Sequence, residues 1–159
     1  YPSTGSGRAS KIYFTSDIAY RDKNGLIRIL GRSDDVIKVA GHRLSTAEME
    51  DAVSKISFVS ECAVIGIPHE IKGEVPVVFA VLKKSQTDVE NKIIETIKKE
   101  IGPIAFPQKI YVVNDLPKTR SGKIMRRILR KLFTKEELGD LSTLANPESV
   151  AGLRKMISQ

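Results

Sequence analysis

The sequence predicts a mixed α/β domain of the α+β kind, in which helices cover a short central sheet and a small β-hairpin comes first. Residues 59–67 and 75–82 are rich in β-branched side chains, which favour strands. Residues 89–101 repeat an apolar side chain at every fourth position, as in a helix with one buried face. Asn24-Gly25 lies between two apolar stretches and is typical of a hairpin turn.

The chain divides into three expected parts. Residues 1–11 are small, polar and rich in Gly and Ser, which is typical of a leader or a linker. Residues 12–33 contain the predicted hairpin and end in a polar junction. Residues 34–159 hold the remaining strands and helices and form the main domain. A length of 159 residues is enough to bury a core without disulfide support.

The main domain begins with a short strand at residues 36–39, which Gly41 ends. Ser45 and Glu48 then form a capping box, in which the Ser45 side chain caps a helix and the Glu48 side chain reaches back. The other expected features are loop segments at 68–70 and 72–73, a helix that Asp88 begins and Gly102-Pro103 ends, a strand at 110–113, a loop at 116–122, a basic helix at 124–133 and a short helix after Asn146-Pro147.

The composition indicates an anionic partner. The formal net charge is +7, from 26 Lys and Arg against 19 Asp and Glu. Nucleic acid, a membrane surface, nucleotides and coenzyme A would all suit this excess of positive charge. No apolar run approaches the roughly 18 residues of a membrane span, so we expect no membrane partner. Cys62 is the only cysteine, which excludes an internal disulfide and favours a cytoplasmic setting.

The loop at residues 117–123 combines three cations with small hydroxyl residues and a glycine. Gly122 lets the backbone approach a ligand closely, and Lys123 follows directly. A lysine is a compact charge on a long stem, suited to stabilising the negative charge of acyl or phosphoryl transfer. The alternative is a solvated basic loop. Lys118 in particular matters little if its cation is only a solvated charge.

Basic residues also gather elsewhere. The helix at 124–133 places Arg126, Arg127, Arg130 and Lys131 on one side, either as a solvated face or as an anion site. The segments at 31–35 and 40–43 combine glycine with charge, and structural ion pairs explain them as well as phosphate binding does. His42 has no partner at zinc-ligand spacing, so we expect no metal site in the chain. The pattern of aromatic residues that nucleic-acid readers use is not recognisable here.

Several motifs occur in an order that resembles a known superfamily. They lie at residues 13–17, 31–44, 67–73, 100–103, 116–127 and 139–145, and the fifth of them contains Pro117-Lys118-Thr119-Arg120-Ser121-Gly122-Lys123. Together they resemble the C-terminal third of the adenylate-forming enzymes: acyl-CoA synthetases, luciferases and peptide-synthetase adenylation domains. The resemblance covers residues 12–157 and is strongest to the acetyl-CoA synthetase subgroup.

The resemblance implies a role for individual residues. Lys123 is implied as the catalytic lysine of acetate adenylation, and relatives are regulated by acetylation at this position. Asp34 is implied as a hinge, with residues 12–33 as a hairpin at an interdomain junction and 34–159 as a lid domain. The remaining implied contacts are Asp17, Arg32 and Arg43 with ATP, and Ala40, Gly41 and Lys98 with coenzyme A.

The resemblance also implies partners. A larger N-terminal adenylation domain would supply the acyl pocket and a pyrophosphate-binding loop, so the chain alone is expected to be inactive. The substrates would be acetate, ATP and coenzyme A, and Mg²⁺ would arrive with ATP on ligands outside this chain. A protein acetyltransferase and a deacetylase would act on Lys123. The alternative function is a stand-alone basic domain that binds nucleic acid or another acidic partner, for which a steep salt dependence is expected.

Overall fold

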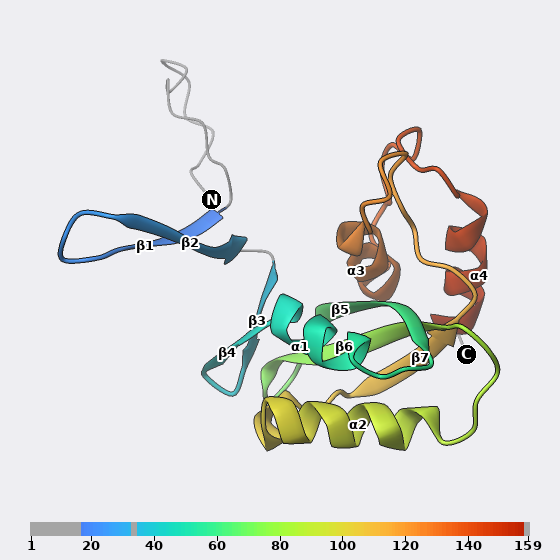
Figure 1. The fold of residues 1–159 in the computed structure, drawn as a ribbon. Coiled ribbons are helices and arrows are strands. Elements are labelled where there is room, and N and C mark those ends of the chain that lie inside the picture. The colour runs from blue at the N-terminus through green and yellow to red at the C-terminus, as the bar shows by residue number, and fades with distance from the viewer. Residues whose placement is uncertain (1–16, 33–34, 158–159) are drawn as a thin grey trace, which may run out of the picture. The chain divides into compact units, whose positions relative to one another are not determined.

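The computed structural model describes residues 17–32 and 35–157. The chain separates into two compact units, Tyr1–Asp34 and Asp35–Gln159, each of which is described by itself. The mixed α/β class is confirmed: a two-stranded hairpin sheet accompanies a five-stranded sheet with helices (Figure 1).

The first unit contains the expected hairpin, formed by β1 (Asp17–Arg21) and β2 (Ile27–Arg32). The strands pair antiparallel, and Asp17 lies opposite Arg32. The turn closes because the Asp22 carboxylate accepts hydrogen bonds from the backbone N–H groups of Asn24 and Leu26, at 2.8 and 3.0 Å. Gly25 takes a φ of +83°, which glycine adopts without strain. The Asn24-Gly25 turn therefore has its expected place.

The second unit is built on five strands: β3 (Val36–Val39), β4 (His42–Ser45), β5 (Val59–His69), β6 (Gly73–Leu82) and β7 (Lys109–Val113). Their order is β4-β3-β6-β5, and β7 pairs with β6 in parallel. The longest ladder joins β5 and β6, which run antiparallel from Val59 opposite Leu82 to His69 opposite Gly73. This ladder is the centre of the unit.

Two details of the sheet differ from expectation. Strand β4 was not predicted, because it has four residues and Leu44 is its one buried side chain, too short a pattern to show alternation. Pro68, His69 and Gly73 belong to β5 and β6 rather than to a loop. Pro68 is tolerated there because, within residues 17–32 and 35–157, β5 pairs only with β6, so its other edge needs no backbone donor.

Within residues 35–157, four α-helices cover the sheet: α1 (Thr46–Ser54), α2 (Val89–Glu100), α3 (Arg126–Thr134) and α4 (Glu148–Ile157), with a short 3₁₀ turn, η2, at Pro103–Ala105. Figure 1 shows α2 on one side of the sheet and α3 and α4 on the other. The Ser45 hydroxyl caps α1 by accepting from the Glu48 backbone N–H at 3.4 Å, which confirms the Ser45 half of the predicted capping box.

The two faces of the β5–β6 ladder support two cores. One core packs α1 and α2 against a sheet face and contains Met49, Ile93 and Val64. The other packs α3 and α4 against the opposite face and contains Ile65, Phe79, Tyr111, Leu129 and Leu153. Phe79 stacks on Tyr111 with ring centres 5.4 Å apart. Successive residues of β5 point to opposite cores, as the period of a strand requires.

Much of the basic face of α3 is engaged in structural ion pairs. The Arg126 guanidinium group donates hydrogen bonds from two nitrogens to the Glu50 carboxylate, which also accepts from the backbone N–H of Val64 at 2.8 Å. Arg130 pairs with Glu74 at 2.8 Å. The face is thus neither simply solvated nor an open anion site, because two of its cations fasten α3 to the rest of the unit.

The Glu50–Arg126 pair yields a stability prediction. Glu50→Ala should lower the free energy of unfolding by about 3 kcal/mol, because it leaves a half-buried guanidinium group and the Val64 N–H without their acceptor. Urea denaturation followed by circular dichroism measures the change.

Asp51→Ala is the matched control, since Asp51 is the next residue of α1 and its carboxylate is 70% exposed in a pair with Lys55. It should cause little change. Equal losses in the two variants would show that the Glu50 pair has no special structural role.

Candidate functional site

Residues 117–125 form a tight hairpin, named here the Lys123 hairpin. The Thr119 backbone N–H donates to the Lys123 carbonyl at 2.9 Å, and the Lys123 N–H donates to the Thr119 hydroxyl at 3.1 Å. Gly122 takes a φ of +80° and donates its N–H to the Thr119 carbonyl at 2.9 Å. Both backbone groups of Lys123 are therefore held by a single neighbour.

The hairpin changes where the basic helix begins. Ile124 pairs with Lys118 in an antiparallel bridge, and the Met125 N–H donates to the Pro117 carbonyl at 2.8 Å. Helix α3 consequently begins at Arg126 and not at Ile124 as the sequence predicts. The two residues before the helix serve the hairpin instead.

The Lys123 side chain is exposed. Among residues 17–32 and 35–157, its ammonium group has no ion pair and no hydrogen bond. Beside the hairpin lies an open depression of about 630 Å³, lined by Thr119, Arg120, Ser121, Ser142 and Thr143. A mobile cation on a fixed backbone, next to hydroxyl groups, can approach a carboxylate or a phosphate that another surface presents.

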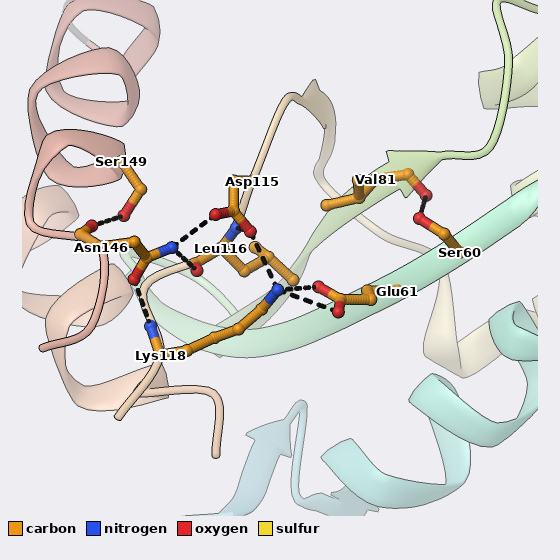
Figure 2. Close-up of polar contacts among 8 residues, drawn as sticks. All are labelled: Ser60, Glu61, Val81, Asp115, Leu116, Lys118, Asn146 and Ser149. Atoms are coloured by element: carbon orange, nitrogen blue, oxygen red, sulfur yellow. Dashed lines mark hydrogen bonds and ion pairs between the residues drawn. The ribbon is translucent and has the colours of Figure 1, made fainter. Parts of the chain in front are cut away.

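Lys118 is not the solvated loop charge that the sequence left open (Figure 2). Its ammonium group lies 2.7 Å from the Glu61 carboxylate and 3.0 Å from the Asp115 carboxylate, and its side chain is 22% exposed. The hydrogen bond to Glu61 raises the pKa of Lys118, against the opposing effect of burial. Lys118 is thus a structural cation, and Lys123 is an available one.

Asp115 is the second carboxylate that contacts the Lys118 ammonium group. Burial would raise its pKa, but hydrogen bonds from the Lys118 and Asn146 side chains and the Leu116 backbone outweigh that effect and lower the pKa. Asn146 is 9% exposed and donates to Asp115 and to the Leu116 carbonyl, at 2.6 and 2.7 Å. No local sequence pattern signals Glu61, Asp115 or Asn146, because they come together only through the fold.

The turn between β3 and β4 is a second candidate surface. Ala40 and Gly41 both have left-handed backbones, with φ of 46° and 86°, and both are exposed. The Ala40 N–H donates to the Lys72 carbonyl at 2.8 Å, which braces the turn against the β5–β6 turn. Arg43 lies just beyond, exposed and without an ion pair among the described residues. The turn offers backbone and small side chains to a ligand.

The remaining candidates are placed as follows. Asp17 and Arg32 face each other across the hairpin of the first unit, at the level of their backbones. Lys98 is exposed in the last turn of α2. Asp34 lies outside the described residues. Figure 1 shows the β3–β4 hairpin and the segment before α3 at opposite ends of the second unit. The structure thus separates the Lys123 hairpin from the Ala40-Gly41 turn.

Other kinds of site find little support in the part of the chain that is described. Those residues contain no group of three or more His, Cys, Asp or Glu side chains that could hold a metal ion. None of the described helices is both long and apolar enough to cross a membrane. Burial raises the pKa of the Cys62 thiol to about 12, with help from the Glu50 carboxylate, so the thiol is not a nucleophile at neutral pH.

Comparison with known protein families finds a match for part of the chain. Residues 48–123 match the family described as the AMP-binding enzyme C-terminal domain. The chain is 52% identical over 153 residues to acetyl-coenzyme A synthetase 1 of Candida glabrata, covering 89% of this chain and 22% of the relative. It is 49% identical over 158 residues to the acetyl-coenzyme A synthetase of Pyrobaculum arsenaticum, covering 98% and 24%. The chain therefore spans about a quarter of these relatives.

Solved structures give the same fold. ATP-bound MatB from Rhodopseudomonas palustris matches with a TM-score of 0.66 and 29% identity, over 76% of this chain and 24% of that one. An acyl-CoA synthetase of Brucella canis matches with a TM-score of 0.59 and 35% identity, over 74% and 22%. Each structure is a longer protein, of which this chain resembles one part.

Two glycines with positive φ, one in the Lys123 hairpin and one at the beginning of β6, give a matched prediction. A Cβ at Gly122 meets open space, so Gly122→Ala should lower the free energy of unfolding by only about 1 kcal/mol, from backbone strain at positive φ. At Gly73 the φ is +78° and a Cβ would lie 3.3 Å from the Lys38 carbonyl, so Gly73→Ala should cost about 2 kcal/mol. Urea denaturation of the two variants compares them, and a larger loss at Gly122 would contradict the packing seen at β3.

Proposed function

We propose that the chain, whose residues 48–123 match the AMP-binding enzyme C-terminal domain family, is the C-terminal lid domain of an acetate–CoA ligase. The observation that carries the proposal is Lys123, an exposed cation on a hairpin whose backbone is fixed. The likeness to acetyl-coenzyme A synthetases over nearly the whole chain supports acetate as the substrate.

In the first half-reaction, an acetate oxygen attacks the α-phosphorus of ATP. The bond from this phosphorus to the oxygen bridging the α- and β-phosphates breaks, pyrophosphate leaves and acetyl-AMP forms. Two anions must approach each other, and negative charge concentrates around the α-phosphate in the transition state. We propose that the Lys123 ammonium group bridges the acetate and the phosphate and thereby lowers this barrier. Mg²⁺ would accompany ATP and screen the departing pyrophosphate.

In the second half-reaction, the coenzyme A thiol loses its proton and attacks the acetyl carbonyl, and AMP leaves. We propose that the lid first rotates about Asp34, so that Lys123 withdraws and the Ala40-Gly41 turn lines the path of the pantetheine arm. The separation of the two surfaces within the second unit supports this alternation, since one orientation presents one surface at a time (Figure 1). The exposed backbone of Gly41 suits close contact with a narrow chain.

The nucleotide and coenzyme contacts are part of the proposal. Asp17 would accept from the ribose hydroxyls of ATP, while Arg32 and Arg43 would contact the ribose and phosphates. Lys98 would neutralise phosphates of coenzyme A. Asp17, Arg43 and Lys98 have exposed side chains, which such contacts require.

Regulation and location are proposals of the same kind. Acetylation of Lys123 by an acetyltransferase would remove the charge that adenylation needs, and a deacetylase would restore it. The exposure of the side chain supports access by such enzymes. We propose a cytoplasmic location, where a single buried cysteine such as Cys62 stays reduced.

The alternative of a stand-alone nucleic-acid-binding domain finds no support in the comparisons. The charge argument behind it is also weakened, because Lys118, Arg126 and Arg130 are engaged in ion pairs within the unit. The net charge therefore overstates the number of cations that are available to bind a polyanion.

Lys123→Ala in the full-length enzyme should slow acetyl-AMP formation by at least about a hundredfold, since one charged contact at a developing anion contributes on the order of 3–4 kcal/mol. It should largely spare thioester formation from preformed acetyl-AMP. Lys123→Arg should also fail, because a planar fork does not replace a compact ammonium. Pre-steady-state assays of the two half-reactions test this, and equal slowing of both would refute the assigned role.

Asp34→Pro tests the proposed hinge. Proline fixes φ near about −65° and restricts rotation at this residue. One half-reaction should then suffer far more than the other, because the lid would be confined near one orientation. The same single-turnover assays measure both steps, and unchanged rates in each would rule out a hinge at Asp34.

A further inference from the structure

Glu61, Asp115, Lys118 and Asn146 contact one another and are named here the Asn146 cluster. This cluster has no part in the function proposed above. We propose that Asn146 and Lys118 are positioning residues for Lys123, through which the segment at 144–149 holds the Lys123 hairpin in its productive place. This inference rests on the proposed role of Lys123. It assigns to the C-terminal segment a part in adenylation, although none of its residues needs to touch a substrate.

The hairpin is held along its outer edge by hydrogen bonds to the backbone of Lys118 and Thr119. The Lys118 N–H donates to the Asn146 side-chain oxygen at 2.9 Å, and the Lys118 carbonyl accepts from the Ala145 N–H at 2.8 Å. The next residue, Thr119, pairs with Leu144 in an antiparallel bridge. Since Thr119 in turn holds both backbone groups of Lys123, the C-terminal segment fixes the strand on which Lys123 depends.

Asn146 connects this segment to the sheet side of the hairpin. Its amide nitrogen donates to the Asp115 carboxylate and the Leu116 carbonyl at 2.6 and 2.7 Å, while its oxygen accepts from Lys118 (Figure 2). Its own carbonyl accepts from the Ser149 hydroxyl at 2.7 Å, at the beginning of α4. A side chain that donates twice and accepts once is required, which an amide supplies and a carboxylate does not.

The Lys118 side chain also holds the Lys123 hairpin, through ion pairs. Its ammonium group lies between the carboxylates of Glu61, on β5, and Asp115, which follows β7. The cation is compensated there, so it does not compete with Lys123 for a substrate anion. It ties the hairpin to β5, while Asn146 ties it to the start of α4. The hairpin is thus held from two sides, and Asp115 contacts both Lys118 and Asn146.

The consequence for catalysis is geometric. A shift of about 1 Å in a catalytic group can slow a reaction by roughly a hundredfold. Loosening the hairpin should therefore slow adenylation, in which Lys123 takes part, and leave thioester formation nearly unchanged. A merely structural role would instead weaken both half-reactions together through loss of folded protein.

The test uses the full-length enzyme and two variants of matched size. Asn146→Asp keeps the oxygen that accepts from Lys118 but replaces the donor with an oxygen that faces Asp115. Lys118→Met removes the charge and keeps an unbranched side chain that is one atom shorter. Each should lower the kcat of acetyl-AMP formation by roughly ten- to a hundredfold, with the KM for ATP within about twofold and thioester formation from preformed acetyl-AMP within about twofold.

Ser60→Ala is the control. Ser60 neighbours Glu61 on β5 and donates to the Val81 carbonyl at 3.0 Å, with no bond to the hairpin (Figure 2). It should leave both half-reactions at the parent rate. A melting curve of each variant reports the folded fraction. If Asn146→Asp is unfolded at the assay temperature, the rates of the two half-reactions in Lys118→Met decide instead. Lys118→Met keeps every hydrogen bond of the Asn146 side chain, so it should fold.

Lys123→Ala, measured alongside, separates this inference from the proposed function. If Lys123→Ala keeps full adenylation, the proposed function is wrong. If it loses adenylation while the folded Asn146→Asp and Lys118→Met variants keep theirs, the proposed function stands and the positioning role is overturned. Parallel loss of both half-reactions in the folded variants would overturn it as well.

Discussion

The arrangement of the second unit depends on the β5–β6 ladder, which is buried on both faces. Because side chains alternate along a strand, Val64 enters the core with α1 and α2, while Ala63 and Ile65 enter the core with α3 and α4. A slip of one residue would exchange the two sets, so the register is strongly specified. Gly66 adds to this specification, since a Cβ there would lie 3.1 Å from the Ile37 side chain of β3.

The ladder also determines where the carboxylates lie, and these carboxylates determine which cations are held in ion pairs. Glu61 projects from β5 and Glu74 from β6, and each takes one cation from the C-terminal third of the chain, Lys118 and Arg130 respectively. These pairs are partly buried, so breaking one leaves a charge poorly solvated. Lys123 lies outside their reach among the described residues and keeps its charge for another surface. The same sheet thus fastens the hairpin and leaves the Lys123 cation available.

The sequence predicts the long elements well, because the apolar period of α2 and the β-branched runs of β5 and β6 are strong local signals. It also singles out Lys123 as a candidate through the motif around it. It does not reveal β4 or the hairpin before α3, which depend on short pairings. The Asn146 cluster is hidden for a related reason: Glu61 and Asn146 are far apart in the sequence, and only the fold brings them together on Lys118.

Composition alone is a poor guide to which charges take part in function. A net charge of +7 suggests an extended basic surface, yet Lys118, Arg126 and Arg130 are compensated by carboxylates within the unit. A cation with a partner has already given up part of its solvation and gained an attraction in return, so a ligand anion must compete with that partner. An exposed cation such as Lys123 has only water to exchange. Coupling an uncompensated side chain to a firmly bonded backbone gives a charge that is both available and well placed, which electrostatic catalysis requires.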